Sequence, residues 1–282
     1  MLTPAAWGRR HVYWLLIAPA LVAMAVFYFY PLLRVLWISV TEPAWGFGNY
    51  ALLVTNPAVQ RILVTTARIC TVTSLLTLVL GYAVAYAMVH VSETHREWML
   101  FCVLLTFWLS VLVRAFAWVM ILRPEGPVNA ALLALGLAAE PVPLVRNEIG
   151  VVIGMVHYML PYAVLPLYAN MQGIDRRLVA AARGLGASPF TAFWRVFLPL
   201  NRPGIVGAGL LVFVFSLGFY ITPAILGGGR TTMIAEYIGI QIQATLRWGL
   251  ATMLASTLLL TVFLMIALMS RVVSLRKLFG AA

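Results

Sequence analysis

Cysteine, lysine and histidine are scarce in this chain of 282 residues. Its two cysteines, Cys70 and Cys102, fall within apolar runs and form no spaced framework, so neither a disulfide scaffold nor a zinc site is supported. The single lysine, Lys277, lies outside any GxxxxGK motif, and the chain therefore lacks the P-loop that binds nucleotide phosphates.

The four histidines indicate no catalytic arrangement with serine, cysteine or aspartate. His90, Glu93 and His95 lie close in sequence, but their spacing is not HExxH and no third ligand is near, which favours a solvated connector. His157 lies in an apolar run and is predicted to be a hydrogen-bonded packing group. We predict no catalytic, cofactor or metal site in this chain.

Apolar residues dominate what remains. The chain is 63% hydrophobic and 10% charged, with a mean hydropathy of +0.98, which indicates an all-α polytopic membrane protein. The run after Arg9 and Arg10 continues through Val40 without a polar stretch, so we interpret it as a retained anchor. Six transmembrane helices are predicted, at about residues 13–39, 62–89, 98–122, 149–172, 204–225 and 249–270.

Arginine placement predicts the orientation. With the N-terminus in the cytoplasm, eleven Arg and Lys residues fall on the inner side and six on the outer side, which fits the positive-inside rule. We therefore predict a cytoplasmic tail at residues 1–12, a single transmembrane domain at 13–270 and a cytoplasmic tail at 271–282. Between spans, residues 123–148 are expected to lie on the outer surface, and residues 226–248 to form a short re-entrant or interfacial helix.

A polar segment between the fourth and fifth spans is the most ordered of the connections. Residues 180–199 read AAARGLGASPFTAFWRVFLP. An alanine-rich helix is predicted to end at Gly186, and a second helix to begin with Ser188 as its cap and Pro189 in its first position. The second helix carries an aromatic face and is predicted to stop at Leu198-Pro199. Its chemistry alone fits a partner-docking segment or an amphipathic connector on the inner membrane surface equally well.

This segment resembles the "EAA" loop of ABC-importer permeases, and further motifs resemble the spermidine/putrescine-type branch of that family. These include HYMLP at 157–161, PLY at 166–168, PGI at 203–205, LGGG at 226–229, RAFAW at 114–118 and GPVN at 126–129. The resemblance implies a type I importer (MetI-like) fold, with a coupling loop at about 175–203. The coupling residues it implies are Ala180, Ala181, Ala182, Arg183, Gly186, Ala187, Ser188, Pro189, Phe190, Val196, Leu198 and Pro199. Ala180 and Gly184 replace acidic residues that are usual in this loop.

The resemblance also implies partners. A second homologous permease would complete the pore, two cytoplasmic ATPases would bind ATP and Mg²⁺, and an external solute-binding protein would deliver cargo in a bacterial inner membrane. The chain itself would then be a non-catalytic transporter subunit.

The cargo implied is a polyamine or a related amine, while opines, aminobutyrate-like solutes and phosphonates stay open. The residues predicted to face the substrate path are Tyr158, Tyr162, Phe219, Tyr220 and Glu236, because aromatic faces and carboxylates attract cations. The six spans contain no Asp or Glu, and Arg34 and Arg114 would repel a polyamine if they lined the path.

Two other classes remain as alternatives at this point. A stand-alone carrier or channel would need no ATPase, and its loop would merely lie on the membrane. A membrane-embedded enzyme is disfavoured, since no acid–base or metal set is evident.

Overall fold

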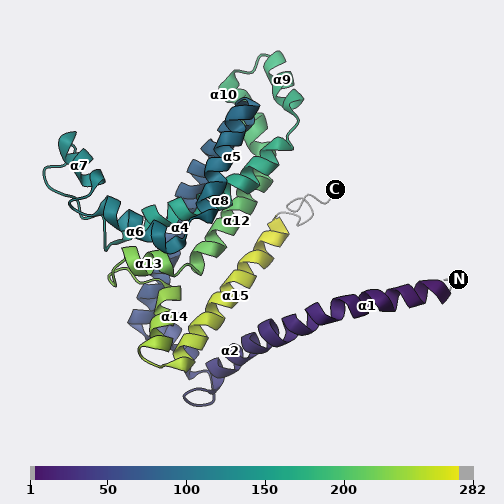
Figure 1. Cartoon of the computed structure of the whole chain (residues 1–282), viewed down its shortest axis with the longest axis vertical. Coiled ribbons are helices and arrows are strands. Elements are labelled where there is room, and N and C mark those ends of the chain that lie inside the picture. Colours follow the sequence, from purple (N-terminus) through teal and green to yellow (C-terminus); the bar gives the residue numbers. More distant parts are fainter. Residues whose placement is uncertain (1–3, 273–282) are drawn as a thin grey trace. The chain divides into compact units, whose positions relative to one another are not determined.

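The computed structural model describes the backbone of residues 4–272 and the side chains of 13–268. The predicted tails at 1–12 and 271–282 therefore lie partly outside the described residues. Every regular element in the described part is helical, which confirms the all-α prediction (Figure 1). The elements are α1 Pro4–Met24, η1 Ala25–Phe29, α2 Tyr30–Thr41, α3 Gly48–Thr55, α4 Pro57–His90, α5 Glu93–Trp108, α6 Val111–Leu122, α7 Pro127–Ala134, α8 Glu148–Gln172, α9 Arg176–Gly184, α10 Pro189–Ala192, η2 Phe193–Phe197, α11 Leu198–Leu200, α12 Arg202–Leu217, α13 Ile221–Leu226, α14 Ile234–Gln243 and α15 Trp248–Val272.

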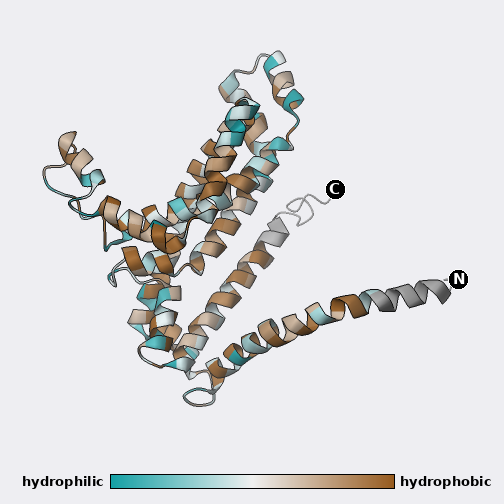
Figure 2. Cartoon of the chain, viewed as in Figure 1, coloured by the Kyte–Doolittle hydropathy of each residue, from teal (hydrophilic) through white to brown (hydrophobic). Residues whose placement is uncertain are grey.

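Among the described residues, four helices are long and apolar enough to cross a membrane, namely Tyr13–Thr41, Pro57–His90, Glu148–Gln172 and Trp248–Leu268. They coincide with the first, second, fourth and sixth predicted spans. Figure 2 shows hydrophobic residues along α2, α8 and α15 and hydrophilic residues on α9. Two bent helix pairs bring the total to as many as six spans if each pair is one span.

The third predicted span is not the continuous helix we expected. The α5 helix ends at Trp108 and α6 begins at Val111, with a 101° bend between the two halves of the pair. Leu109 and Ser110 have ψ angles of 130° and 136°, which interrupt the helical hydrogen bonds. Both flanks are apolar, so hydropathy did not reveal the break.

The fifth predicted span, 204–225, is also interrupted. The α12 helix ends at Leu217, Gly218 caps it, and the short α13 starts at Ile221. In the opposite direction α12 follows the helical residues 189–200 after a bend of 62°. The short helix predicted within residues 226–248 does form, as α14, and residues 123–148 contain the short helix α7.

Two π-helical turns precede prolines in the same way. In η1 the N–H of Tyr30 donates to the carbonyl of Ala25, one residue before Pro31, and in η2 Leu198 donates to Phe193, one residue before Pro199. A proline ring clashes with the carbonyl four residues earlier in an α-helix, and a wider turn relieves that clash. The helix therefore continues through Pro199 to Leu200, and the predicted stop at Leu198-Pro199 is wrong.

The chain divides into two compact units, residues 4–56 with 238–259 and residues 57–237 with 260–272. In the first unit, the Asn49 side chain ties α3 to the end of α2, donating to the carbonyls of Ser39 (3.1 Å) and Glu42 (2.6 Å). The hydroxyls of Ser39 and Tyr50 lie 2.9 Å apart.

The second unit packs α4, α5, α8 and α12 side by side (Figure 1). Its apolar core contains Met88 of α4, Met159 and Leu167 of α8, and Val212 of α12. Polar residues of α4 are also buried in this unit; they are Thr66, Thr73, Ser74 and Thr77.

Gly81 lies where α4 and α8 approach each other closely, so a substitution there tests this packing. A Cβ added to Gly81 of α4 would lie 2.8 Å from the Cβ of Ala163 on α8. We expect Gly81→Ala to lower the free energy of unfolding by about 1–2 kcal/mol, because both backbones must move apart. Thermal unfolding in detergent measures this. Gly48→Ala, at a site with nothing within 4 Å of the new Cβ, is the control and should cost nothing.

Candidate functional sites

The loop segment, residues 175–203, begins at a capped helix. The Asp175 carboxylate accepts a hydrogen bond from the N–H of Arg177 (2.9 Å) and so caps α9. The Arg176 guanidinium donates to the carbonyl of Val89 near the end of α4. These contacts anchor α9 to the span ends. Ala180, Ala181 and Arg183 are exposed, and Ala182 is half-buried.

Gly186 ends α9 in a Schellman motif. Its N–H donates to the carbonyl of Arg183 (3.0 Å), and the N–H of Ala187 donates to that of Ala182 (3.1 Å). Gly186 has φ +90°, which a residue with a side chain rarely adopts. The turn presents Leu185 to solvent, with 91% of its surface exposed.

The second helix of the loop segment starts as predicted. The Ser188 hydroxyl accepts from the N–H of Thr191 (3.1 Å), and Pro189 occupies the first turn of α10. Val196, Leu198 and Pro199 are half-buried.

The aromatic residues of this helix divide into two sets. Phe193 and Phe197 point toward the end of α4, where each ring centroid lies 5.4 Å from that of Tyr86. The single docking face expected from the sequence is therefore only half available, because Phe190 (72%) and Trp194 (51%) are the exposed pair.

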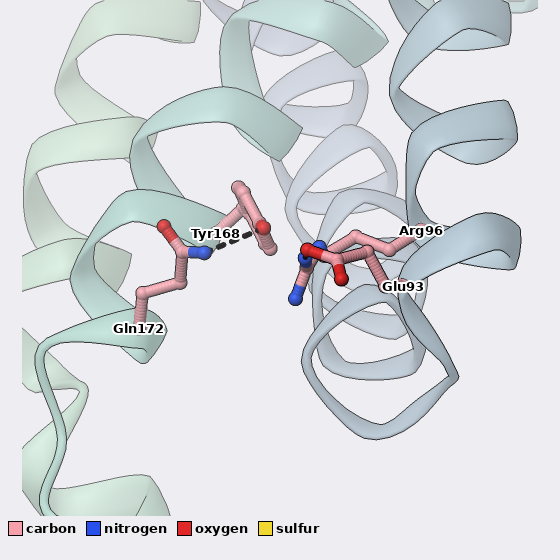
Figure 3. Close-up of polar contacts among 4 residues, drawn as sticks. All are labelled: Glu93, Arg96, Tyr168 and Gln172. Atoms are coloured by element: carbon pink, nitrogen blue, oxygen red, sulfur yellow. Dashed lines mark hydrogen bonds and ion pairs between the residues drawn. The ribbon is translucent and has the colours of Figure 1, made fainter.

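A pocket of about 350 Å³ separates the loop segment from the ends of α4 and α8. Its lining includes Tyr86 and His90 of α4, Met171 of α8, Arg183 of α9 and Phe197 of η2. At the neighbouring helix ends, Arg96 pairs with Glu93 of α5 (2.7 Å) and Gln172 donates to Tyr168 of α8 (2.6 Å), as Figure 3 shows. Both polar pairs stay within one helix, so they stiffen the span ends without tying them together.

The surface of the loop segment combines apolar and basic groups. Its exposed large apolar side chains are Leu178, Leu185, Phe190, Trp194 and Leu200. Its exposed arginines are Arg176, Arg177, Arg183, Arg195 and Arg202. Large apolar side chains rimmed by charge are typical of protein-docking surfaces.

A second candidate site lies where the two broken helices meet α8. We define the aromatic cluster as Phe107, Tyr158, Tyr162, Phe215 and Phe219. Phe107 lies in the last turn of α5 and contacts Tyr162 (5.1 Å between centroids), which also contacts Phe215 of α12 (4.9 Å). Phe219, in the α12–α13 break, lies 4.4 Å from Tyr158.

Arg114 of α6 lies on this cluster. Its guanidinium carbon is 4.3 Å from the centroid of the Tyr158 ring, a cation–π contact, and the residue is only 9% exposed. The Nε of Arg114 has no hydrogen-bond partner among the described residues. Beside it, Trp118 Nε1 donates to Nδ1 of His157 (3.2 Å), which confirms His157 as a hydrogen-bonded packing group.

The structure brings together three of the five predicted path residues, Tyr158, Tyr162 and Phe219. Tyr220 is adjacent and exposed. Glu236 lies instead on α14, whose first residue Ile234 donates to the hydroxyl of Thr66 (2.9 Å). Glu236 is 6% exposed, and its Oε2 has no partner among the described residues.

Glu236 gives stability a pH dependence. Burial raises the pKa of its carboxyl above the ordinary value. Between the ordinary and the raised pKa the folded protein binds more protons than the unfolded one, so stability falls as pH rises through that window. We expect Tm to fall between about pH 5 and about pH 8 by less in Glu236→Gln than in the wild type. Parallel Tm curves for the two proteins would contradict this account.

Two features of these sites escaped sequence reasoning. Tyr86 and His90 of α4 contact the loop segment, which lies about 100 residues later in the chain. Within a continuous apolar span, nothing in the sequence identifies these two residues as contact residues. Arg114 was conspicuous as a charge in an apolar run, but its position on Tyr158 depends on the helix break before it, which hydropathy did not reveal.

Residues 77–277 match the family model described as "Binding-protein-dependent transport system inner membrane component". The chain is 31% identical over 213 residues to the "Spermidine/putrescine transport system permease protein PotB" of Haemophilus influenzae, covering 75% of this chain and 74% of that one. It is 30% identical over 230 residues to the protein of the same name from Escherichia coli, covering 81% and 83%.

Solved structures show the same fold. A permease chain of a bacterial ABC transporter that imports the acidic polysaccharide alginate aligns with a TM-score of 0.74, at 21% identity, over 96% of this chain and 99% of its own. A chain of the MetNI methionine ABC transporter aligns with a TM-score of 0.56, at 16% identity, over 77% and 97%.

Proposed function

Because the chain belongs to the family of binding-protein-dependent transport system inner membrane components, we propose that it is a permease subunit of an ABC importer whose cargo is a polyamine. The observation that carries this is its identity of 30–32% to spermidine/putrescine permeases over about 80% of its length. The sequence alternatives of an opine, an aminobutyrate-like solute or a phosphonate have no comparable support.

In this proposal the loop segment is the contact with the ATPase. Leu185, Phe190 and Trp194 supply an exposed apolar surface, and the exposed arginines can pair with acids of a partner. Because Phe193 and Phe197 pack on Tyr86 at the end of α4, a push on the loop segment is passed to that span. The chain contributes no hydrolytic step: two partner ATPases bind ATP and Mg²⁺.

The remaining partners complete a path across the membrane. A second homologous permease forms the other half of the path, and an external solute-binding protein delivers the cargo. A related solved structure is described as an alginate ABC transporter in complex with a pentasaccharide-bound periplasmic protein, which supports this arrangement. We place the chain in a bacterial inner membrane, with both termini and the loop segment in the cytoplasm, on the strength of its arginine distribution.

The aromatic cluster supports an organic cation as cargo. Tyr158 and Tyr162 are half-buried, one helical turn apart and stacked at 6.1 Å, so their faces form a strip on which spaced ammonium groups can bind. Such rings desolvate a cation without fixing it by a salt bridge, which suits a site that cargo must leave.

The test is to purify the chain with its native partners, reconstitute the complex in vesicles, and measure uptake of spermidine and putrescine with and without ATP. ATP-dependent uptake that requires both the ATPase and the solute-binding protein is expected. Uptake by this chain alone would indicate the stand-alone carrier instead, and uptake of a non-amine solute only would overturn the cargo.

A further inference from the structure

Arg114 places an uncompensated positive charge inside the transmembrane part of the chain. Its side chain is almost fully buried, and its Nε has no hydrogen-bond partner in the described residues. The predicted spans contain no Asp or Glu to neutralise it. A buried charge at membrane depth is costly, and such residues usually mark an ion or substrate path.

The surroundings of Arg114 are built to receive a cation. The Tyr158 ring lies 4.3 Å from its guanidinium carbon, and Phe219 and Tyr162 extend the aromatic surface on either side. Two helices, α5 and α12, end at the breaks beside this cluster, and the carbonyl ends of helices carry partial negative charge. Discontinuous helices of this kind form the central sites of many transporters.

We propose that Arg114 is a tethered cation that covers the face of Tyr158, bars small inorganic cations from the path, and is displaced by an amine of the cargo. This rests on the proposed function, in which the path carries an organic cation. A fixed charge in a poorly solvated site repels any other cation that enters, a polyamine included, so a cargo passes only if its binding gains exceed this repulsion. An inorganic cation has only the ring to gain, whereas a polyamine replaces the guanidinium on Tyr158 and binds a second ammonium at Tyr162.

The test separates this barrier from active transport. The complete complex is reconstituted in vesicles without ATP or solute-binding protein, and passive fluxes of potassium and glycerol are measured. In Arg114→Gln we expect the potassium flux to rise about tenfold or more. Removing the charge lowers the electrostatic barrier to potassium entry, and the rate of entry rises exponentially as that barrier falls. Glycerol flux should not change.

Two variants control for charge and for position. Arg114→Lys keeps the charge and should keep the potassium flux near that of the wild type. Arg123→Gln removes an exposed charge from the end of the same helix and should also leave the flux unchanged. Unchanged potassium flux in Arg114→Gln overturns the proposal, as does an equal rise for glycerol, which would indicate a hole rather than a lost charge.

A second variant, Tyr158→Leu, tests whether the cargo displaces Arg114, and it can be used if Arg114→Gln fails to assemble. Tyr158→Leu keeps the charge but removes the ring, so the potassium flux should stay low while ATP-driven polyamine uptake falls about tenfold. Unchanged uptake overturns the displacement. If wild-type vesicles show no amine uptake at all, the proposed cargo fails, yet the potassium result still decides whether Arg114 is a barrier.

Discussion

Gly186→Arg reduces ATP-driven uptake about thirtyfold or more while the protein still inserts and assembles its spans. The expected size follows from hot-spot contacts, each worth roughly 2 kcal/mol or more, which the change displaces. Nothing lies within 4 Å of a Cβ at this position, so crowding is not the cause. The cause is φ +90°, which arginine disfavours strongly, so the turn must rearrange and redirect both Leu185 and α10. Uptake and receptor-stimulated ATP hydrolysis in vesicles measure the effect.

Two neighbouring changes make this prediction specific to the backbone. Gly184→Ala lies two residues earlier, also has open space around the new Cβ, and has no positive φ, so it should leave uptake unchanged. Gly186→Asn should retain much of the uptake, because asparagine tolerates the left-handed region better than arginine does. If the Arg variant imports at the wild-type rate, the turn has no part in coupling.

The long spans were predictable because their signal is local. A helix such as α4 or α8 satisfies its own backbone in lipid, so an apolar run of sufficient length nearly dictates the element. The turn at Gly186 and the cap at Ser188 were predictable for the same reason, since glycine and serine act on backbone groups a few residues away.

The break between α5 and α6, which helps to build the aromatic cluster, was not predictable in this way. Neither Leu109 nor Ser110 is a proline or a glycine, and apolar residues flank them on both sides. After this break α6 packs against α8 and α13, which are distant in sequence, so the signal for the break is not local. The end of the second helix of the loop segment was also predicted wrongly, because the rule that proline stops a helix ignores the π turn that accommodates Pro199.

The aromatic residues of the loop segment divide in a way that the sequence did not predict. Phe190, Phe193, Trp194 and Phe197 recur at helical spacing and were assigned to one face. In the structure, two of them pack inward on α4 and two remain exposed. A helix that both anchors to a span and docks on a partner needs apolar residues on two sides, and periodicity alone does not separate these roles.

Leu185→Asp is the most direct test between an ATPase-coupled permease and a stand-alone carrier or channel. Leu185 is the most exposed of the large apolar residues of the loop segment, so the change costs little folding free energy. In a complex it would bury a carboxylate at the centre of the docking surface. Loss of one such contact costs roughly 2 kcal/mol or more, which weakens ATPase binding about thirtyfold. Recovery of ATPase with the purified chain measures this.

The matched control is Leu135→Asp, because Leu135 precedes the glycine of a second Schellman motif, as Leu185 does in the loop segment. At the end of α7, Gly136 has φ +68° and its N–H and that of Leu137 donate to Leu133 and Leu132, as their counterparts do after α9. Leu135 is 72% exposed, but it lies on the segment predicted for the outer side. ATPase recovery should be unaffected there. Undiminished ATPase recovery in Leu185→Asp, equal to that in Leu135→Asp, would mean that Leu185 is not part of the contact with the ATPase, and the docking role proposed for this surface of the loop segment would be overturned.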